Sequence, residues 1–95
     1  MVTRKERMES STVVALNQAV AVAMLEGARR GLELVEALGR SGSLDEYLFF
    51  HSTRAELLRR VDRREEARLA YLRALELAGN AAERRFLQNR LLLFQ

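Results

Sequence analysis

Apolar side chains recur along this chain at the three- and four-residue spacing of amphipathic helices. The pattern predicts five helices, over residues 12–26, 28–38, 43–60, 64–78 and 81–94. Proline is absent, and the glycines other than Gly31 fall at or near the predicted helix ends, where glycine favours termination. Short connections between amphipathic helices favour antiparallel hairpins, so an all-α domain is expected over residues 12–95. Residues 1–11 show no periodicity and are expected to be a flexible leader.

Local capping signals support three of these helices. One of Ser10, Ser11 and Thr12 is expected to cap the first helix, and Asn80 to cap the fifth. Ser43 is followed three residues later by Glu46, which is the spacing of a capping box at the start of the third helix. The last three helices are expected to bury Leu44, Leu48, His51, Ala55 and Leu58, then Ala67, Ala70, Tyr71, Ala74 and Leu75, then Phe86, Leu87, the stem of Arg90, Leu91 and Phe94.

Small and large side chains repeat along the chain with an offset of 36 residues. Ala19, Val22, Gly31, Val35 and Leu38 align in this way with Ala55, Leu58, Ala67, Tyr71 and Ala74. Paired small residues allow two helices to approach closely, and a large residue then fills the space beside them. This arrangement resembles the tetratricopeptide (TPR) repeat, whose period is about 34 residues. The expected architecture is a TPR-like repeat of two helix pairs followed by a C-terminal capping helix.

A narrower resemblance rests on three strings: LNQAVAVA, HSTRAELLRR and LELAGNAAERRFL. Taken together they resemble the C-terminal extension of a subgroup of extracytoplasmic-function sigma factors, which are sigma-70 type RNA polymerase sigma factors of bacteria. The resemblance covers about residues 12–92. It implies a role in controlling sigma-factor activity, with the rest of the factor or RNA polymerase as partners. The promoter-recognition domains of the family are not in this chain, so it is not expected to read promoters directly.

Composition narrows the chemistry that the chain can perform. There are no cysteines, which excludes disulfides and thiolate metal sites. The net charge is only +3. Nearly all of the basic residues are arginine. A basic start followed by an apolar stretch from Val13 to Leu25 has features of a secretory signal, but polar residues interrupt it, and no apolar run reaches the ~18 residues of a membrane span. A cytoplasmic protein without membrane attachment is expected.

Neither catalysis nor a cofactor is predicted. His51 is the only histidine, and no acid lies at metal-ligand spacing from it, so it is expected to pack between helices with one ring nitrogen hydrogen-bonded. Ser52 and Thr53 point to other faces of the same predicted helix, because adjacent helical residues diverge by about 100°. Glu65 precedes Arg68 by three residues, which indicates surface ion pairing. We therefore expect no catalytic, cofactor-binding or metal-binding residue.

Binding to another protein is the expected function. The first helix is apolar on almost every side and therefore needs cover on every side. Its outer face is expected to contact either the upstream part of an intact sigma factor or, in isolation, a second copy of the chain as a homodimer. The predicted interaction residues are Val13, Leu16, Val20 and Met24 on this helix, with Arg84, Arg85 and Arg90 on the last helix.

Two alternative functions remain open at this stage. The chain could be a free-standing TPR-like adaptor that binds peptides in a groove along the first and third helices. It could also be a weak nucleic-acid binder, with phosphate or another anion contacted by Arg59, Arg60, Arg63 and Arg64. Glu56, Glu65 and Glu66 lie among these arginines, and Glu56 precedes Arg60 at helical spacing, which favours ordinary pairing on the surface.

Overall fold

The computed structural model describes the backbone of residues 4–95 and the side chains of residues 11–95. Five α-helices follow one another, with no strand among residues 4–95: α1 (Arg4–Glu26), α2 (Ala28–Gly39), α3 (Leu48–Arg60), α4 (Arg64–Leu77) and α5 (Ala81–Leu91). A short 3-10 helix, η1 (Leu92–Phe94), continues α5. The predicted all-α class is confirmed. None of the helices in the described chain is long and apolar enough to cross a membrane.

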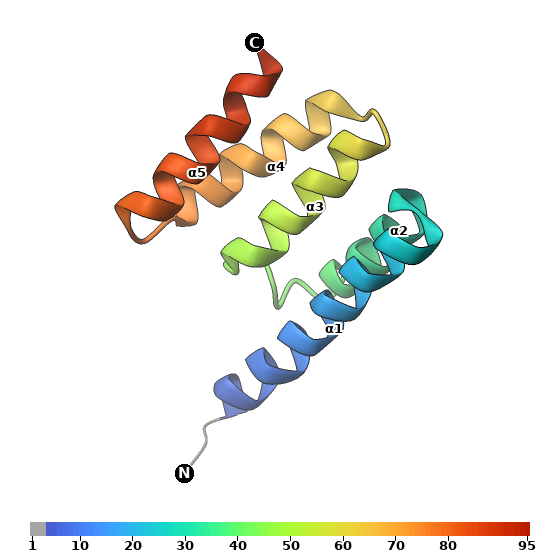
Figure 1. The fold of residues 1–95 in the computed structure, drawn as a ribbon. Helices are drawn as coiled ribbons and strands as arrows, with labels where there is room; N and C mark the ends of the chain where they lie inside the picture. Colours follow the sequence, from blue (N-terminus) through green and yellow to red (C-terminus); the bar gives the residue numbers. More distant parts are fainter. Residues whose placement is uncertain (1–3) are drawn as a thin grey trace.

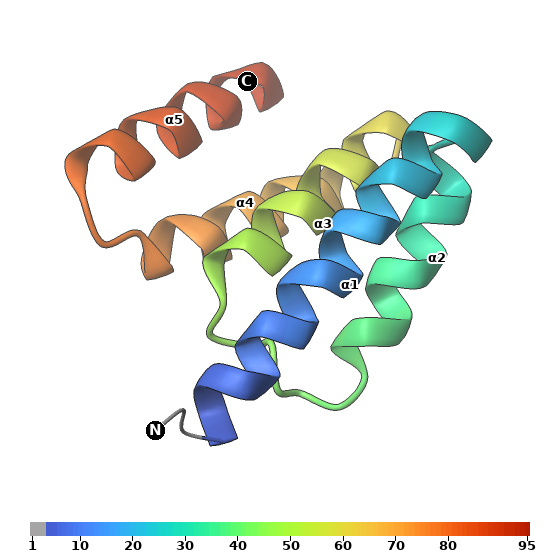
Figure 2. The ribbon, with the colours of Figure 1, turned by 60° about the horizontal axis from the view of Figure 1, so that its bottom comes forward.

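Successive helices pack against one another along the chain (Figure 1). Each helix turns back along the preceding one, so that α1 and α2 form one antiparallel hairpin and α3 and α4 form a second. Helix α5 packs on α4, and α1 also contacts α3 directly. When the molecule is turned, α1 and α5 lie on opposite sides of α3 (Figure 2). This places α3 at the centre of one face.

Helix α1 begins earlier than the serine and threonine caps suggested. It runs from Arg4, so Ser10, Ser11 and Thr12 lie inside it and do not cap it. The residues before them are mostly Arg, Lys, Glu and Met, which favour helices intrinsically and give the chain no reason to leave helical geometry. The part of the expected leader from Arg4 to Ser11 is therefore helical, and residues 1–3 lie outside the described residues.

Helix α3, by contrast, begins later than predicted. It starts at Leu48, so the proposed capping box of Ser43 and Glu46 does not form. The backbone N–H of Ser43 instead donates to the hydroxyl of Ser41 at 3.3 Å, in a series of turns. These turns carry Leu44 into the core, where it is 5% exposed. The Ser43 hydroxyl lies 2.9 Å from that of Ser41, so it is engaged within these turns and does not cap a helix.

The other boundaries follow the sequence signals. Gly27 ends α1 with φ at 104°, and Asp62 forms the turn between α3 and α4 with φ at 68°. The Asn80 side chain caps α5 by accepting the backbone N–H of Glu83 at 2.8 Å, as predicted. The Glu83 carboxylate accepts the N–H of Gly79 at 2.9 Å, so both groups satisfy donors at the helix start.

The core is built largely from aliphatic and alanine side chains. Its largest fully buried members are Tyr71, Leu16, Leu58, Leu87 and Val35. A Cβ added at Gly31 would lie 2.5 Å from the Cβ of Ala23 and 3.0 Å from the carbonyl oxygen of Ala19. Because no side chain could occupy that space, glycine at this position lets α2 approach α1 closely.

The predicted core residues are mostly buried. Those at least nine-tenths buried are Leu44, Ala55, Leu58, Ala67, Ala70, Tyr71, Ala74 and Leu87, and those partly buried are Leu48, His51, Leu75, Arg90, Leu91 and Phe94. Phe86 was predicted to face inward but is 51% exposed. The prediction was wrong because α5 covers α4 with Leu87 at its centre, and the neighbouring Phe86 turns toward the open face of α3.

Candidate interaction groove

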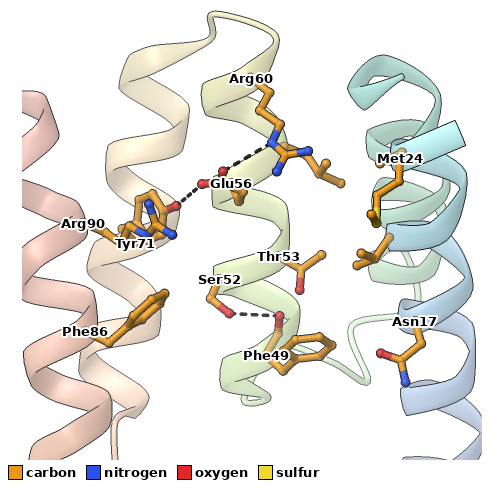
Figure 3. A pocket seen from close by; sticks show the side chains of 13 residues that line it. Asn17, Met24, Phe49, Ser52, Thr53, Glu56, Arg60, Tyr71, Phe86 and Arg90 are labelled. Atoms are coloured by element: carbon orange, nitrogen blue, oxygen red, sulfur yellow. Dashed lines mark hydrogen bonds and ion pairs between the residues drawn. The ribbon is translucent and has the colours of Figure 1, made fainter. Parts of the chain in front are cut away.

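A groove of about 620 Å³ opens on the face centred on α3 (Figure 3). This volume is typical of ligand-binding sites, which range over about 300–1,000 Å³. Helix α3 forms its floor, while α1 and α5 form its two sides. It is lined by Asn17, Val20, Ala23 and Met24 of α1, by Phe49, Ser52, Thr53, Glu56, Leu57 and Arg60 of α3, by Tyr71 of α4, and by Phe86 and Arg90 of α5.

Helical periodicity explains why these side chains meet. Asn17, Val20 and Met24 are three and four residues apart, so they form one stripe along α1. The positions that line the groove from α3 have the same spacing. Figure 3 shows Phe86 and Arg90 of α5 across α3 from Asn17 and Met24 of α1. Two helices that do not adjoin in the chain thus face each other across a third.

The sides of the groove expose large apolar side chains. Met24 is 77% exposed on α1, Phe86 is 51% exposed on α5, and Phe49 is 37% exposed at the start of α3. Single exposed apolar residues are common on protein surfaces, whereas apolar residues that gather around one concavity mark an interaction site. Other exposed apolar residues, such as Leu25 at 85% and Val14 at 56%, lie outside the groove, so it is the concavity and not exposure alone that makes this face a candidate site.

Glu56 lies in the middle of the groove floor and is held by three donors. Arg59 donates to both carboxylate oxygens, at 2.6 Å and 3.2 Å, and Arg60 donates at 3.3 Å. The Tyr71 hydroxyl donates at 2.8 Å. Burial alone would raise the pKa of Glu56, but the hydrogen bonds from Arg59 and Tyr71 and the positive charges of Arg59 and Arg90 lower that pKa to about 2. Glu56 is therefore ionised throughout the physiological range.

Tyr71 connects the groove floor to the core. Its side chain comes from α4 and is 1% exposed. Burial and the hydrogen bond to Glu56 raise the pKa of Tyr71 to about 12, so its hydroxyl remains a proton donor. The Tyr71 ring also packs against Phe94, with ring centroids 5.9 Å apart. One side chain thus ties together α3, α4 and the C-terminal η1.

Arg90 has a different environment from the other arginines near the floor. Its guanidinium carbon lies 5.2 Å from the centre of the Phe86 ring. Among the side chains of residues 11–95, no carboxylate lies within 4.0 Å of it. Arg60 contacts Glu56 but remains 48% exposed. Arg60 and Arg90 line the groove with Glu56 as the one carboxylate among its lining residues, so the groove carries excess positive charge.

The predicted interaction residues divide into three groups. Val20, Met24 and Arg90 line the groove. Val13 is partly buried, and Arg84 and Arg85 are exposed on α5, but none of these three lines the groove. Leu16 is fully buried in the core and is therefore not part of an outer face. The first helix looked apolar all round, and only the tertiary structure shows that the Leu16 stripe is the side that α1 buries.

The arginines predicted as an anion site are engaged within the chain. Arg59 and Arg60 bind Glu56, and Arg63 forms an ion pair with Glu66 at 2.5 Å. Hydrogen bonding to the Glu66 carboxylate raises the pKa of Arg63. Arg64 donates to the backbone carbonyl of Leu93 at 3.0 Å, with its guanidinium over the Phe94 ring. The predicted pair of Glu65 with Arg68 is also present, at 2.5 Å.

His51 has one ring nitrogen hydrogen-bonded, as expected, and its contacts are with the preceding turn and with its own helix. Its Nε2 lies 2.8 Å from the backbone carbonyl oxygen of Asp45, and its ring meets Phe50 edge-on with centroids 5.0 Å apart. Within the part of the chain that the structure describes, no group of three or more His, Cys, Asp or Glu side chains is placed to hold a metal ion.

Comparison with known proteins gives one relative that bears on this chain. The chain is 43% identical over 86 residues to this relative, an uncharacterized protein of Rhizobium meliloti (strain 1021). The alignment covers 90% of this chain but only 20% of that protein, so the chain spans about a fifth of the length of the relative it matches. No known family's sequence model matches the chain, and the comparison with solved structures found no match.

Sequence reasoning placed a groove along the first and third helices only for the adaptor alternative, and it named no residue of the third helix as lining that groove. Glu56 was expected to pair with Arg60, which it does at 3.3 Å, but its bond to Tyr71 was not foreseen. A usable signal was present in the 36-residue offset, because this offset carries Val20 and Met24 of α1 onto Glu56 and Arg60 of α3. Applying the repeat to the predicted interaction face would have indicated α3 as part of the same surface.

Proposed function

We propose that this chain is a protein-interaction and regulatory module of the kind found as the C-terminal extension of extracytoplasmic-function sigma factors. In this function it modulates transcription initiation in the bacterial cytoplasm through contacts with the rest of the factor or with RNA polymerase. It performs no catalysis. The observation that carries the proposal is the groove across α1, α3 and α5, whose sides expose Met24 and Phe86.

The details of helix packing support a TPR-like repeat as the basis of this module. Ala19 and Ala55, which are 36 residues apart, are 1% and 0% exposed. Gly31 and Ala67 have the same offset and both are buried, and Gly31 lies against Ala19 and Ala23 of the neighbouring helix. Close approach at two matched places would make two similar hairpins, with α5 covering the end of the second one.

The comparison with the Rhizobium meliloti protein supports a module that also occurs within longer chains, since four-fifths of that protein lies outside the matched region. The three strings LNQAVAVA, HSTRAELLRR and LELAGNAAERRFL point to sigma factors as those longer chains. Under this proposal the Rhizobium meliloti protein contains promoter-binding domains, and the segment similar to this chain regulates them.

The proposal is tested by transcription with the Rhizobium meliloti protein and bacterial core RNA polymerase. The intact protein should direct promoter-specific transcription, and deleting the segment similar to this chain should change the yield at least about fivefold, which corresponds to a coupling of about 1 kcal/mol. Failure of the intact protein to bind core polymerase would refute the sigma-factor proposal. Unchanged transcription after the deletion would refute the regulatory role.

A free-standing peptide-binding adaptor is the second candidate. The observation that favours it is the course of the groove along α1 and α3, which is where such an adaptor would bind its ligand. It predicts that the chain acts without sigma domains, so the transcription experiment separates the two candidates. The nucleic-acid alternative is less favoured, because Arg59, Arg60 and Arg63 already contact carboxylates of the chain.

Self-association of the isolated chain is a further testable alternative. Val14 and Leu25 are 56% and 85% exposed on α1 and do not line the groove. A homodimer formed through this side of α1 would persist in sedimentation after Met24→Ser and dissociate after Leu25→Ser.

A further inference from the structure

We propose that the groove across α1, α3 and α5 binds an acidic amphipathic helix from a protein partner, with its apolar face between Met24 and Phe86 and a carboxylate at Arg90. This inference rests on the proposed function as a protein-interaction module, and it adds the chemistry of the partner segment.

The shape of the groove selects an elongated ligand. Helices α1 and α5 both run alongside α3 (Figure 2), and Met24 and Phe86 face each other across it (Figure 3). A segment lying along α3 would contact Met24 and Val20 on one side and Phe86 on the other. Apolar side chains repeating at helical spacing on the ligand would match the helical spacing of these groups. A helix that presents one apolar face therefore fits the arrangement.

Charge complementarity makes the polar face of that helix acidic. The carboxylate of Glu56 already accepts hydrogen bonds from Arg59, Arg60 and Tyr71, so it offers little attraction to an incoming cation. Arg90 has its guanidinium over Phe86 and no carboxylate of residues 11–95 within 4.0 Å. An acidic side chain at the ligand's edge would therefore meet an arginine that is already oriented, while a basic side chain would be repelled.

The same groove is poorly suited to nucleic acid. Phosphate backbones are bound by rows of cations that are free to replace counterions. Here a carboxylate, Glu56, occupies the middle of the floor, and exposed apolar groups such as Met24 occupy the side. Phe86 could stack on a base, but its face is covered by the guanidinium of Arg90. These features favour a protein ligand.

The test uses the whole 95-residue chain and two synthetic peptides of about four helical turns. One peptide carries leucines at helical spacing with glutamates elsewhere, and the other is identical except that lysines replace the glutamates. Fluorescence anisotropy of labelled peptides measures both affinities. The acidic peptide should bind at least about tenfold more tightly than the lysine peptide, and the preference should shrink as salt is raised.

Two pairs of matched variants locate the binding. Arg90→Gln should weaken the acidic peptide about tenfold, while Arg84→Gln, on the same helix but outside the groove, should leave it within about twofold. Met24→Ser should weaken binding about threefold, while Leu25→Ser, its equally exposed neighbour outside the groove, should not. Because Met24 is 77% exposed, this second pair remains informative even if Arg90→Gln unfolds the chain.

Several outcomes would overturn the proposal. They are no binding of the acidic peptide, equal binding of the two peptides, or equal losses within either pair of variants. Displacement of the bound acidic peptide by random-sequence nucleic acid would assign the groove to phosphate binding. A dimer that dissociates on Met24→Ser would assign it to a second copy of the chain. Any of these results could occur while the transcription experiment succeeds, so the two proposals fail independently.

Discussion

The two helical hairpins achieve close packing with different chemistry. The α1–α2 hairpin contains no aromatic residue, and its helices approach where Gly31 lies against Ala19 and Ala23. The α3–α4 hairpin is built around Tyr71, which is 1% exposed and hydrogen-bonded to Glu56. The first hairpin thus depends on the absence of side-chain volume, and the second depends on a large side chain with a polar anchor.

The predicted 36-residue offset makes this contrast specific. It places Val20 with Glu56 and Val35 with Tyr71. An apolar pair of positions in the first hairpin has become a hydrogen-bonded pair in the second. The exchange occurs at the centre of the molecule, where α3 forms the groove floor between α1 and α5. The comparison teaches that positions matched by the offset present different surfaces in the two hairpins, apolar on α1 and charged on α3.

The largest effect is expected from removing the anchor of the second hairpin. Tyr71→Ala should lower the free energy of unfolding by about 4 kcal/mol, because it leaves a cavity and removes the hydroxyl that donates to Glu56. The matched change Val35→Ala removes less volume from the first hairpin and should cost about 2 kcal/mol. Urea unfolding followed by circular dichroism measures both. Equal losses would show that the two positions contribute alike, and that the second hairpin does not depend more than the first on a large side chain.

Filling the close contact of the first hairpin should come next in size. Gly31→Val should cost about 3 kcal/mol, since any Cβ there would be 2.5 Å from that of Ala23 and must push the helices apart. Gly79→Ala is the control, because its Cβ would approach only a Glu83 carboxylate oxygen, at 3.8 Å. Urea unfolding should show the control close to wild type. A neutral Gly31→Val would mean that this contact does not determine the hairpin spacing.

Acid should weaken the second hairpin selectively. The pKa of Glu56 is about 2 in the folded chain, against 4.5 for an unperturbed glutamate as in the unfolded chain. Its contribution to the stability of the fold is therefore complete above about pH 4.5. This contribution, on the order of 2 kcal/mol, is lost as the pH falls from about 4.5 toward about 2.

Urea midpoints measured across that pH range check this contribution. Glu56→Gln should lower stability at neutral pH and flatten the acid dependence. Glu65 and Glu66 also have lowered pKa values, through hydrogen bonds from Arg68 and Arg63. They account for the dependence of stability on pH that remains in this variant. If Glu56→Gln loses stability in acid as the wild type does, Glu56 is not the group responsible for that loss.

The smallest effect on stability is expected on the open side of the first hairpin. Met24→Ser should change the free energy of unfolding by less than about 0.5 kcal/mol, because the side chain is 77% exposed. Thermal unfolding of the variant and the wild type measures the difference. A loss above about 1 kcal/mol would show that Met24 packs within the chain and is not available to a partner.

Local sequence signals were sufficient to predict most of the helix boundaries. The stop at Gly27, the turn at Asp62 and the cap at Asn80 depend on short-range geometry, and the structure has all three. The two boundary errors, at the starts of α1 and α3, arose where a capping residue was present but another preference was stronger. At α1 this was the helix propensity of the preceding residues, and at α3 it was the local hydrogen bonding of Ser43 with Ser41.

The amino-acid sequence by itself determined the helical class, the positions of most turns and the small residues that permit close packing, because these follow from periodicity and local backbone preference. Only the tertiary structure decided that Leu16 is buried while Met24 is open, and that Glu56, Tyr71 and Arg90 meet from three helices. Periodicity identifies the faces of each helix, but which faces become covered depends on how the hairpins pack, and that is a property of the whole chain.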